Sequence, residues 1–227
     1  MPNRLTLLID TGLDQCRVAL AQGDKIVADR CDPISRGHAE ALAPMVDTVA
    51  ETAGCTPKDL GRIIASVGPG SFTGVRVGVA YARGLALALD IPAVGVSTLV
   101  AMGCVVSGAV HPGAVVVALD ARRGQIYAQA FENGQPADEP QAISAADFAA
   151  STPAPDLIVG SGAALLHNHW PDADIKPLDG PTALGLLTAA TLAPRALSPL
   201  YLRAPGATPP KPSPLSPALW SPPHDRA

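Results

Sequence analysis

Two aspartates that each end an apolar segment are the first residues with a chemistry to consider. Asp10 follows LTLLI and precedes Thr11 and Gly12, whereas Asp120 follows VVVAL and precedes the sequence ARRG. A carboxylate at the end of a strand can face a phosphate group or a magnesium ion held through water. It can also cap a turn by hydrogen bonding to its own backbone, and the two arginines of ARRG can equally be solvated loop charges. Both interpretations stay open.

Glycine-rich turns are the second candidate for binding. The segment Gly68–Gly74 reads GPGSFTG, and glycines before a helix expose N–H groups that bind anions. It is not a Walker loop, since no lysine follows the last glycine, and Ser71 is not in the frame of a serine nucleophile. A tight turn with Ser71 or Thr73 as the helix N-cap explains it equally. Gly160–Ala163 fits an adenosine-side loop or plain packing.

The candidate nucleotide or phosphate cleft predicted from these features consists of Asp10, Thr11, Gly68, Gly70, Ser71, Asp120, Gly160 and Gly162.

No histidine or cysteine is spaced for a metal site. His38 and Glu40 lie two residues apart and therefore on different faces of a helix, and the other histidines do not complete a set of ligands. The four cysteines contain no C-x-x-C pair, which predicts free thiols in a reducing cytoplasm. We therefore expect no metal on this chain.

The composition excludes several classes of protein. With 48% hydrophobic and 16% charged residues, the 227-residue chain can bury a core, which excludes a disordered protein. A net charge of −4 without a basic run argues against RNA binding by this chain alone, and 4% aromatic residues argue against a stacking platform for nucleic acid. We expect neither secretion nor a membrane span, because no signal sequence precedes the first strand and prolines break the uncharged stretch between Asp90 and Asp120.

Hydrophobic periodicity predicts the elements that position these residues. The first half contains three strands, a helix, a strand and a helix, at residues 5–10, 16–22, 25–31, 38–53, 62–68 and 73–89. The second half repeats this order at residues 114–119, 125–132, 145–150, 156–160 and 163–169, with a weak strand at 141–143. The pattern predicts an α/β fold of two lobes with a duplicated β-β-β-α-β-α unit, as in the actin, hexokinase and Hsp70 superfamily. We expect lobes at residues 1–105 and 106–204, and a disordered proline-rich tail at 205–227.

Six motifs carry a resemblance to a known family. They are SRGHAEALAP (35–44), GPGSFTGVRVGVAYARGLA (68–86), PAVGVSTL (92–99), LDARRGQIYA (119–128), GSGA (160–163) and PLYLRAP (199–205). In this order, over roughly residues 5–205, they resemble the TsaB (YeaZ) family. The resemblance implies an actin-like fold and a part in making N6-threonylcarbamoyladenosine, the modified adenosine beside the anticodon of tRNAs that decode ANN codons.

The resemblance also implies a non-catalytic role and a set of partners. The chain would form a heterodimer with a catalytic TsaD-like paralogue, work with a TsaE-like ATPase, and meet tRNA only through the complex; a homodimer of the isolated chain stays open. Catalytic paralogues carry a V-N-H-x-x-x-H metal motif, and Thr98 and Met102 stand at the two histidine positions here. No cofactor is expected on this chain, and ATP is expected to bind weakly at most or at an interface of the complex.

The predicted partner surface lies on the helices at 38–53 and 73–89. Its residues are His38, Leu42, Met45, Val46, Val49, Gly74, Arg76, Gly78, Val79 and Ala82. Glutamate at Val46 or Val79 is expected to break the heterodimer. The arginines nominated as contributors to tRNA binding are Arg76, Arg83, Arg122, Arg123 and Arg203.

Two other functions are weighed against this one. The fold alone would also suit a small-molecule kinase, which needs a catalytic aspartate facing the cleft, and a peptidase would need a metal pair or a catalytic triad. The sequence offers no convincing candidate for either.

Overall fold

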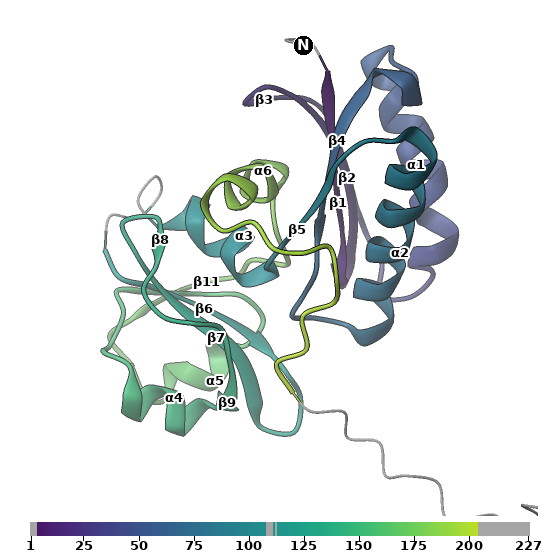
Figure 1. Ribbon diagram of the computed structural model, residues 1–227. Coiled ribbons are helices and arrows are strands. Elements are labelled where there is room, and N and C mark those ends of the chain that lie inside the picture. The colour runs from purple at the N-terminus through teal and green to yellow at the C-terminus, as the bar shows by residue number, and fades with distance from the viewer. Residues whose placement is uncertain (1–3, 108–110, 112, 204–227) are drawn as a thin grey trace, which may run out of the picture.

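The computed structural model describes residues 4–107, 111 and 113–203. The predicted proline-rich tail lies outside these residues. Two mixed sheets form the framework (Figure 1). The first has the order β3-β2-β1-β4-β5, with β1 Leu5–Leu13, β2 Gln15–Gln22, β3 Lys25–Pro33, β4 Leu60–Ser66 and β5 Ala93–Val96. The second has the order β11-β10-β6-β7-β8, with β9 also on β7; its strands are β6 Val115–Asp120, β7 Gln125–Glu132, β8 Gln135–Pro136, β9 Gln141–Ser144, β10 Leu157–Val159 and β11 Asp174–Lys176.

Three helices belong to each half. They are α1 His38–Ala53, α2 Phe72–Leu89, α3 Thr98–Val106, α4 Ala145–Ser151, α5 Ala163–His167 and α6 Ala183–Leu192, with a short 3-10 turn at Pro57–Asp59. The first half therefore runs β-β-β-α-β-α-β-α, and the second half follows the same order with two short strands, β8 and β9, in the place of the third strand. Corresponding strands have the same order in the two sheets. This duplicated, two-lobed α/β fold is the predicted actin, hexokinase and Hsp70 architecture, and the prediction is confirmed.

The observed repeat unit is one strand and one helix longer than predicted. The missing helices are α3 and α6, which are buried on most sides. A helix buried on most sides carries few polar residues, so it lacks the stripe of 3.6-residue periodicity that reveals a surface helix. The weak strand at residues 141–143 is real and forms β9.

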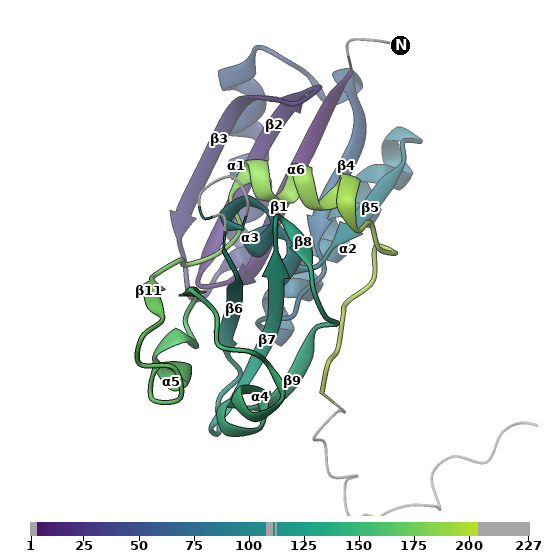
Figure 2. The same cartoon turned by 90° about the vertical axis from the view of Figure 1, so that its left-hand side faces the viewer.

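The helices form layers on both sides of each sheet. Helices α1 and α2 cover the outer face of the first sheet, and α4 and α5 cover the outer face of the second. Helix α6 lies across the inner face of the first sheet (Figure 2), while α3 packs on the second sheet and against α6. Each half thus covers the sheet of the other, which fixes the two lobes together; the division at residues 105 and 106 stays a prediction.

Local sequence signals set the element boundaries near the cleft. The two-residue turn Gly23-Asp24 joins β2 to β3 as predicted, with Gly23 at φ 58°. Helix α2 begins after Ser71, whose hydroxyl accepts a hydrogen bond from Gly74 N at 3.3 Å, so the predicted N-cap is confirmed. Helix α2 has the length and composition of a membrane span, and it packs on β1 and β4 of the first sheet.

Candidate functional site

A cavity with a volume of about 960 Å³ lies between the lobes. The first half lines it with the β1–β2 turn, part of β3, and Gly70 and Ser71. The second half contributes the β6–β7 turn, Ser161 and Asp179. Residues from two duplicated hairpins therefore face one another across the cleft.

Three of the eight predicted cleft residues line this cavity: Gly70, Ser71 and Asp120. The other five, which are Asp10, Thr11, Gly68, Gly160 and Gly162, do not line it. Gly68 packs beside Val75 and the backbone of Leu200, and a side chain at Gly160 or Gly162 would meet the backbone of the β6 strand. These glycines permit close packing rather than contact with a ligand.

Strand alternation turns Thr11 away from the cleft, and burial separates Asp10 from it. Both are buried, with 0% and 1% of their surface exposed, and successive residues of a strand point to opposite faces. The Thr11 hydroxyl donates to Gly74 O of α2 at 2.7 Å. Asp10 points to the other face, toward the interior between the sheets.

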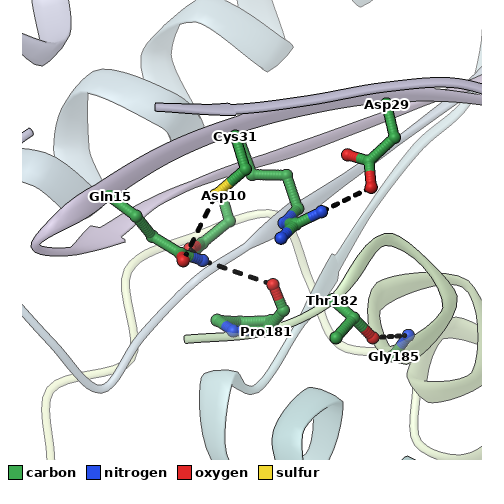
Figure 3. Close-up of polar contacts among 8 residues, drawn as sticks. Asp10, Gln15, Asp29, Cys31, Pro181, Thr182 and Gly185 are labelled. Carbon is green, nitrogen blue, oxygen red and sulfur yellow. Dashed lines mark hydrogen bonds and ion pairs between the residues drawn. The ribbon is translucent and has the colours of Figure 1, made fainter. Parts of the chain in front are cut away.

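Asp10 holds a buried hydrogen-bond network (Figure 3). The Ser66 hydroxyl donates to Asp10 Oδ1, and Gln15 Nε2 lies 3.2 Å from Asp10 Oδ2 and 3.3 Å from Pro181 O. The Gly12 N–H also donates to Oδ1 at 3.3 Å, so the turn-capping interpretation is the one observed. The network connects β1, β2 and β4 to the segment that leads into α6.

Burial raises the pKa of Asp10, and the hydrogen bonds from Ser66 and Gln15 act in the opposite direction. A carboxyl without solvent contact, whose oxygens already accept hydrogen bonds from this chain, is a positioning group for the fold. It has no free oxygen directed at the cleft with which to hold a magnesium ion.

Asp120, the equivalent residue of the second half, lies in a different environment. It is partly exposed, accepts from Arg122 N at 2.7 Å and pairs with Arg122 Nη1 at 3.3 Å. Arg122, Arg123 and Gly124 all have positive φ, at 64°, 57° and 73°. The turn therefore uses a left-handed backbone to bring Arg122 back over Asp120.

The charge of the cleft does not favour a polyphosphate. Three carboxylates line it, those of Asp14, Asp120 and Asp179, against the single guanidinium of Arg122. Among the residues that the structure describes, no group of three or more histidine, cysteine, aspartate or glutamate side chains could hold a metal ion. A phosphate would thus approach like charges with one cation in compensation.

Comparison with known proteins places the chain in a family. The family model described as "TsaD: tRNA N6-adenosine threonylcarbamoyltransferase" matches residues 32–158. A protein of Escherichia coli named tRNA threonylcarbamoyladenosine biosynthesis protein TsaB is 40% identical over 134 residues, which are 56% of this chain and 56% of that protein. The chain belongs to the TsaB (YeaZ) family.

Other relatives extend the match. The Bacillus subtilis protein of the same name is 35% identical over 56% of this chain and 54% of its own length. The alignments thus span about half the length of these two TsaB relatives. An uncharacterized protein of Mycobacterium tuberculosis is 34% identical over 89% of this chain and 93% of its own length. The crystal structure of YeaZ from Pseudomonas aeruginosa is 26% identical with a TM-score of 0.75, covering 88% of this chain and all of that one.

Thr98 and Met102, which the family resemblance predicts at the positions of two metal-binding histidines, lie in helix α3. Thr98 and Met102 are one turn apart and are 0% and 1% exposed. The Thr98 hydroxyl has no hydrogen-bond partner in the described structure. A neutral hydroxyl and a thioether offer a divalent cation far weaker ligands than two imidazoles.

The structure corrects most of the partner surface predicted for this TsaB family member. Eight of its ten residues are buried in the chain's own core: His38, Leu42, Met45, Val49, Gly74, Gly78, Val79 and Ala82. Their apolar character is explained by packing of α1 and α2 on the first sheet, and His38 Nε2 lies 3.1 Å from Leu13 O. Val46 stays half-buried and Arg76 exposed.

The outward face of α2 carries residues that the sequence analysis missed. Ala80, Gly84 and Leu87 are exposed, and Leu87 keeps 85% of its surface. Small residues at a spacing of four, followed by an exposed leucine, allow close approach of another helix. That α1 and α2 face the partner stays a prediction, and these exposed residues of α2 now support it.

Proposed function

We propose that this chain is a non-catalytic subunit of a complex that makes N6-threonylcarbamoyladenosine beside the anticodon of ANN-decoding tRNAs. The observation that carries the proposal is the 40% identity with the Escherichia coli protein named for this biosynthesis. The threonylcarbamoyl transfer itself takes place on a TsaD-like paralogue.

The cleft supports a role without chemistry of its own. Asp10 on β1 is buried in a hydrogen-bond network away from the cleft, and Ser71, which lines the cleft, caps α2. Thr98 and Met102 replace the metal-binding histidines of catalytic paralogues. With three carboxylates in the cleft, ATP binds this chain weakly at most, or at an interface of the complex.

The proposed partners are those that the family resemblance implies. The outward face of α1 and α2, with Ala80, Gly84 and Leu87, packs against the equivalent helices of the paralogue, and a TsaE-like ATPase joins the pair. The chain works in the cytoplasm and meets tRNA only within the complex.

Reconstitution tests the proposal. The chain is combined with its TsaD-like paralogue, the TsaE-like ATPase, threonylcarbamoyl-adenylate and an unmodified ANN-decoding tRNA, and the modified nucleoside is measured by mass spectrometry. We expect modification with all components and little without this chain. Full modification in its absence, or hydrolysis of ATP or a peptide by the chain alone, would overturn the proposal.

A further inference from the structure

The last described segment crosses from one lobe to the other. After α6, Arg195 pairs with Gly95 of β5 through two backbone hydrogen bonds of 2.8 and 2.9 Å. Leu200 N then donates to Val67 O at 2.7 Å, and the Arg203 guanidinium donates to the side chain of Gln125 at the start of β7. Figure 1 shows this segment, in yellow, passing between α2 and the second sheet.

The segment builds an exposed stack of two rings and an arginine. The Arg76 guanidinium lies 3.5 Å from the centre of the Phe72 ring, and Arg76 Nε donates to the Tyr201 hydroxyl at 2.8 Å. The two rings are 5.8 Å apart between centroids. Phe72 is 59% exposed and Tyr201 50%. Because the two rings adjoin, they expose apolar surface as one patch, which marks an interaction site better than scattered single residues do.

Three more arginines continue the edge that this stack begins. Arg203 follows Tyr201 by two residues and contacts Gln125, which directly follows the left-handed β6–β7 turn with Arg122 and Arg123. Arg122 pairs with Asp120, but in the described part of the chain Arg76, Arg123 and Arg203 have no carboxylate partner. This edge therefore carries uncompensated positive charge on a chain whose net charge is −4.

We propose that Phe72, Arg76, Arg122, Arg123, Tyr201 and Arg203 form a surface that binds a single-stranded RNA loop, with guanidinium groups on phosphates and an unpaired base against the exposed rings. The proposal rests on the function proposed above and adds a direct contact with the tRNA to it. Guanidinium groups pair with phosphate oxygens through two hydrogen bonds. Unpaired RNA bases stack on aromatic side chains and arginine planes.

The combination of charge and rings favours RNA over a protein partner. An acidic peptide would satisfy the arginines, but the planar faces of Phe72 and Tyr201 beside them match a base and a phosphate of one nucleotide. The sequence analysis argued against such a platform from the scarcity of aromatic residues. The fold assembles it from positions 125 residues apart.

Arg83 is the nominated arginine that falls outside this surface. It lies two turns beyond Arg76 on α2, about 10 Å further along the helix axis. Arg62 serves as the internal control because it lies at the start of β4. Phe72 and Arg76 follow the opposite end of that strand, so Arg62 is distant from the proposed surface.

The test measures binding of an RNA stem-loop, with the anticodon-arm sequence of an ANN-decoding tRNA, to the heterodimer of this chain and its paralogue. Affinity is determined by fluorescence anisotropy over a series of salt concentrations. Each of Arg123→Gln and Arg203→Gln should make the negative slope of log K against log salt less steep by about 1, because each removes a phosphate contact. Arg62→Gln should leave affinity and slope unchanged.

The rings are tested separately from the charges. Tyr201→Leu should weaken binding of the stem-loop about tenfold and leave binding of a continuous duplex of the same stem unchanged, since only an unpaired base can stack. Tyr201→Phe keeps the ring, loses the bond to Arg76, and should bind within about twofold of the unaltered chain.

Three outcomes overturn the surface. The first is an unchanged salt slope in the Arg123 and Arg203 variants. The second is a loss of RNA affinity in Arg62→Gln equal to the loss in those variants. The third is that the Arg123 and Arg203 variants dissociate from the paralogue without a change in slope, which would make this edge a protein contact. The unaltered complex is assayed for tRNA modification in parallel. Modification by that complex together with unchanged RNA binding of the variants refutes only the surface, whereas no modification refutes the proposed function.

Discussion

Replacing Asp10 by alanine removes the acceptor at the centre of the buried network between β1, β2 and β4. The Ser66 hydroxyl and the Gly12 N–H lose the oxygen to which they donate. Gln15 Nε2 keeps its second acceptor, Pro181 O at 3.3 Å. Two buried donors are therefore left without a partner.

The expected cost follows from these two donors. A buried donor without an acceptor costs about 1–3 kcal/mol, so Asp10→Ala should destabilise the chain by about 2–6 kcal/mol. For a chain of this length the melting temperature falls by about 2–4 °C per kcal/mol, which predicts a decrease of about 4–24 °C. Asp120→Ala is the matched control from the second half, and removing its exposed pair with Arg122 should cost about 0.5 kcal/mol or less.

The pH dependence gives a second, independent readout. Burial raises the folded-state pKa of Asp10 above its ordinary value of 3.8, so the native state holds this proton more tightly than the unfolded state. The stability from this group is fully present below 3.8 and is lost as the pH rises through the folded pKa. Asp10→Asn does not titrate, so the stability of the unaltered chain relative to this variant should decrease as the pH rises.

The assay is urea unfolding followed by circular dichroism at several pH values. The reasoning is refuted if Asp10→Ala is no less stable than Asp120→Ala. It is also refuted if the stability of the unaltered chain relative to Asp10→Asn increases with pH, because the carboxylate would then be stabilised in its charged form.

Three further predictions, with four substitutions and one labelling experiment, probe the helices and the core. Val79→Glu should unfold the chain, because an unpaired charge in the core costs roughly 3–5 kcal/mol. Ala80→Glu should keep the native circular dichroism spectrum and abolish co-elution with the paralogue. Co-elution of both variants with the paralogue would contradict this prediction. Gly84→Ala should stabilise the chain by up to about 1 kcal/mol, since nothing surrounds that position, while Gly78→Ala should destabilise it because the added methyl group meets the Thr11 hydroxyl. Burial raises the pKa of Cys104 to about 12, so iodoacetamide at mildly alkaline pH should label it only after unfolding, as peptide mapping would show.

Local patterns in the sequence were sufficient to predict the elements that have one solvent-exposed face. The stripe of Leu42, Met45 and Val49 predicts α1 with the observed bounds, His38 to Ala53, because helical spacing of apolar residues is set by the 3.6-residue turn. The same stripe could not say what it packs against. The sequence predicts this stripe as a partner surface, but in the structure it packs on the chain's own first sheet.

The sequence also placed the Ser71 cap, the two-residue turn at Gly23 and the duplicated order of strands, since each depends on residues close together along the chain. The tertiary structure alone decided that Asp10 and Asp120, alike in sequence context, differ in role. Strand direction and the packing of the segment before α6 bury the first, whereas the second stays at the edge of the cleft beside Arg122. It also decided that Phe72, Arg76 and Tyr201 share one surface, because contacts across long stretches of chain depend on how the two lobes pack and leave no periodic trace in the sequence.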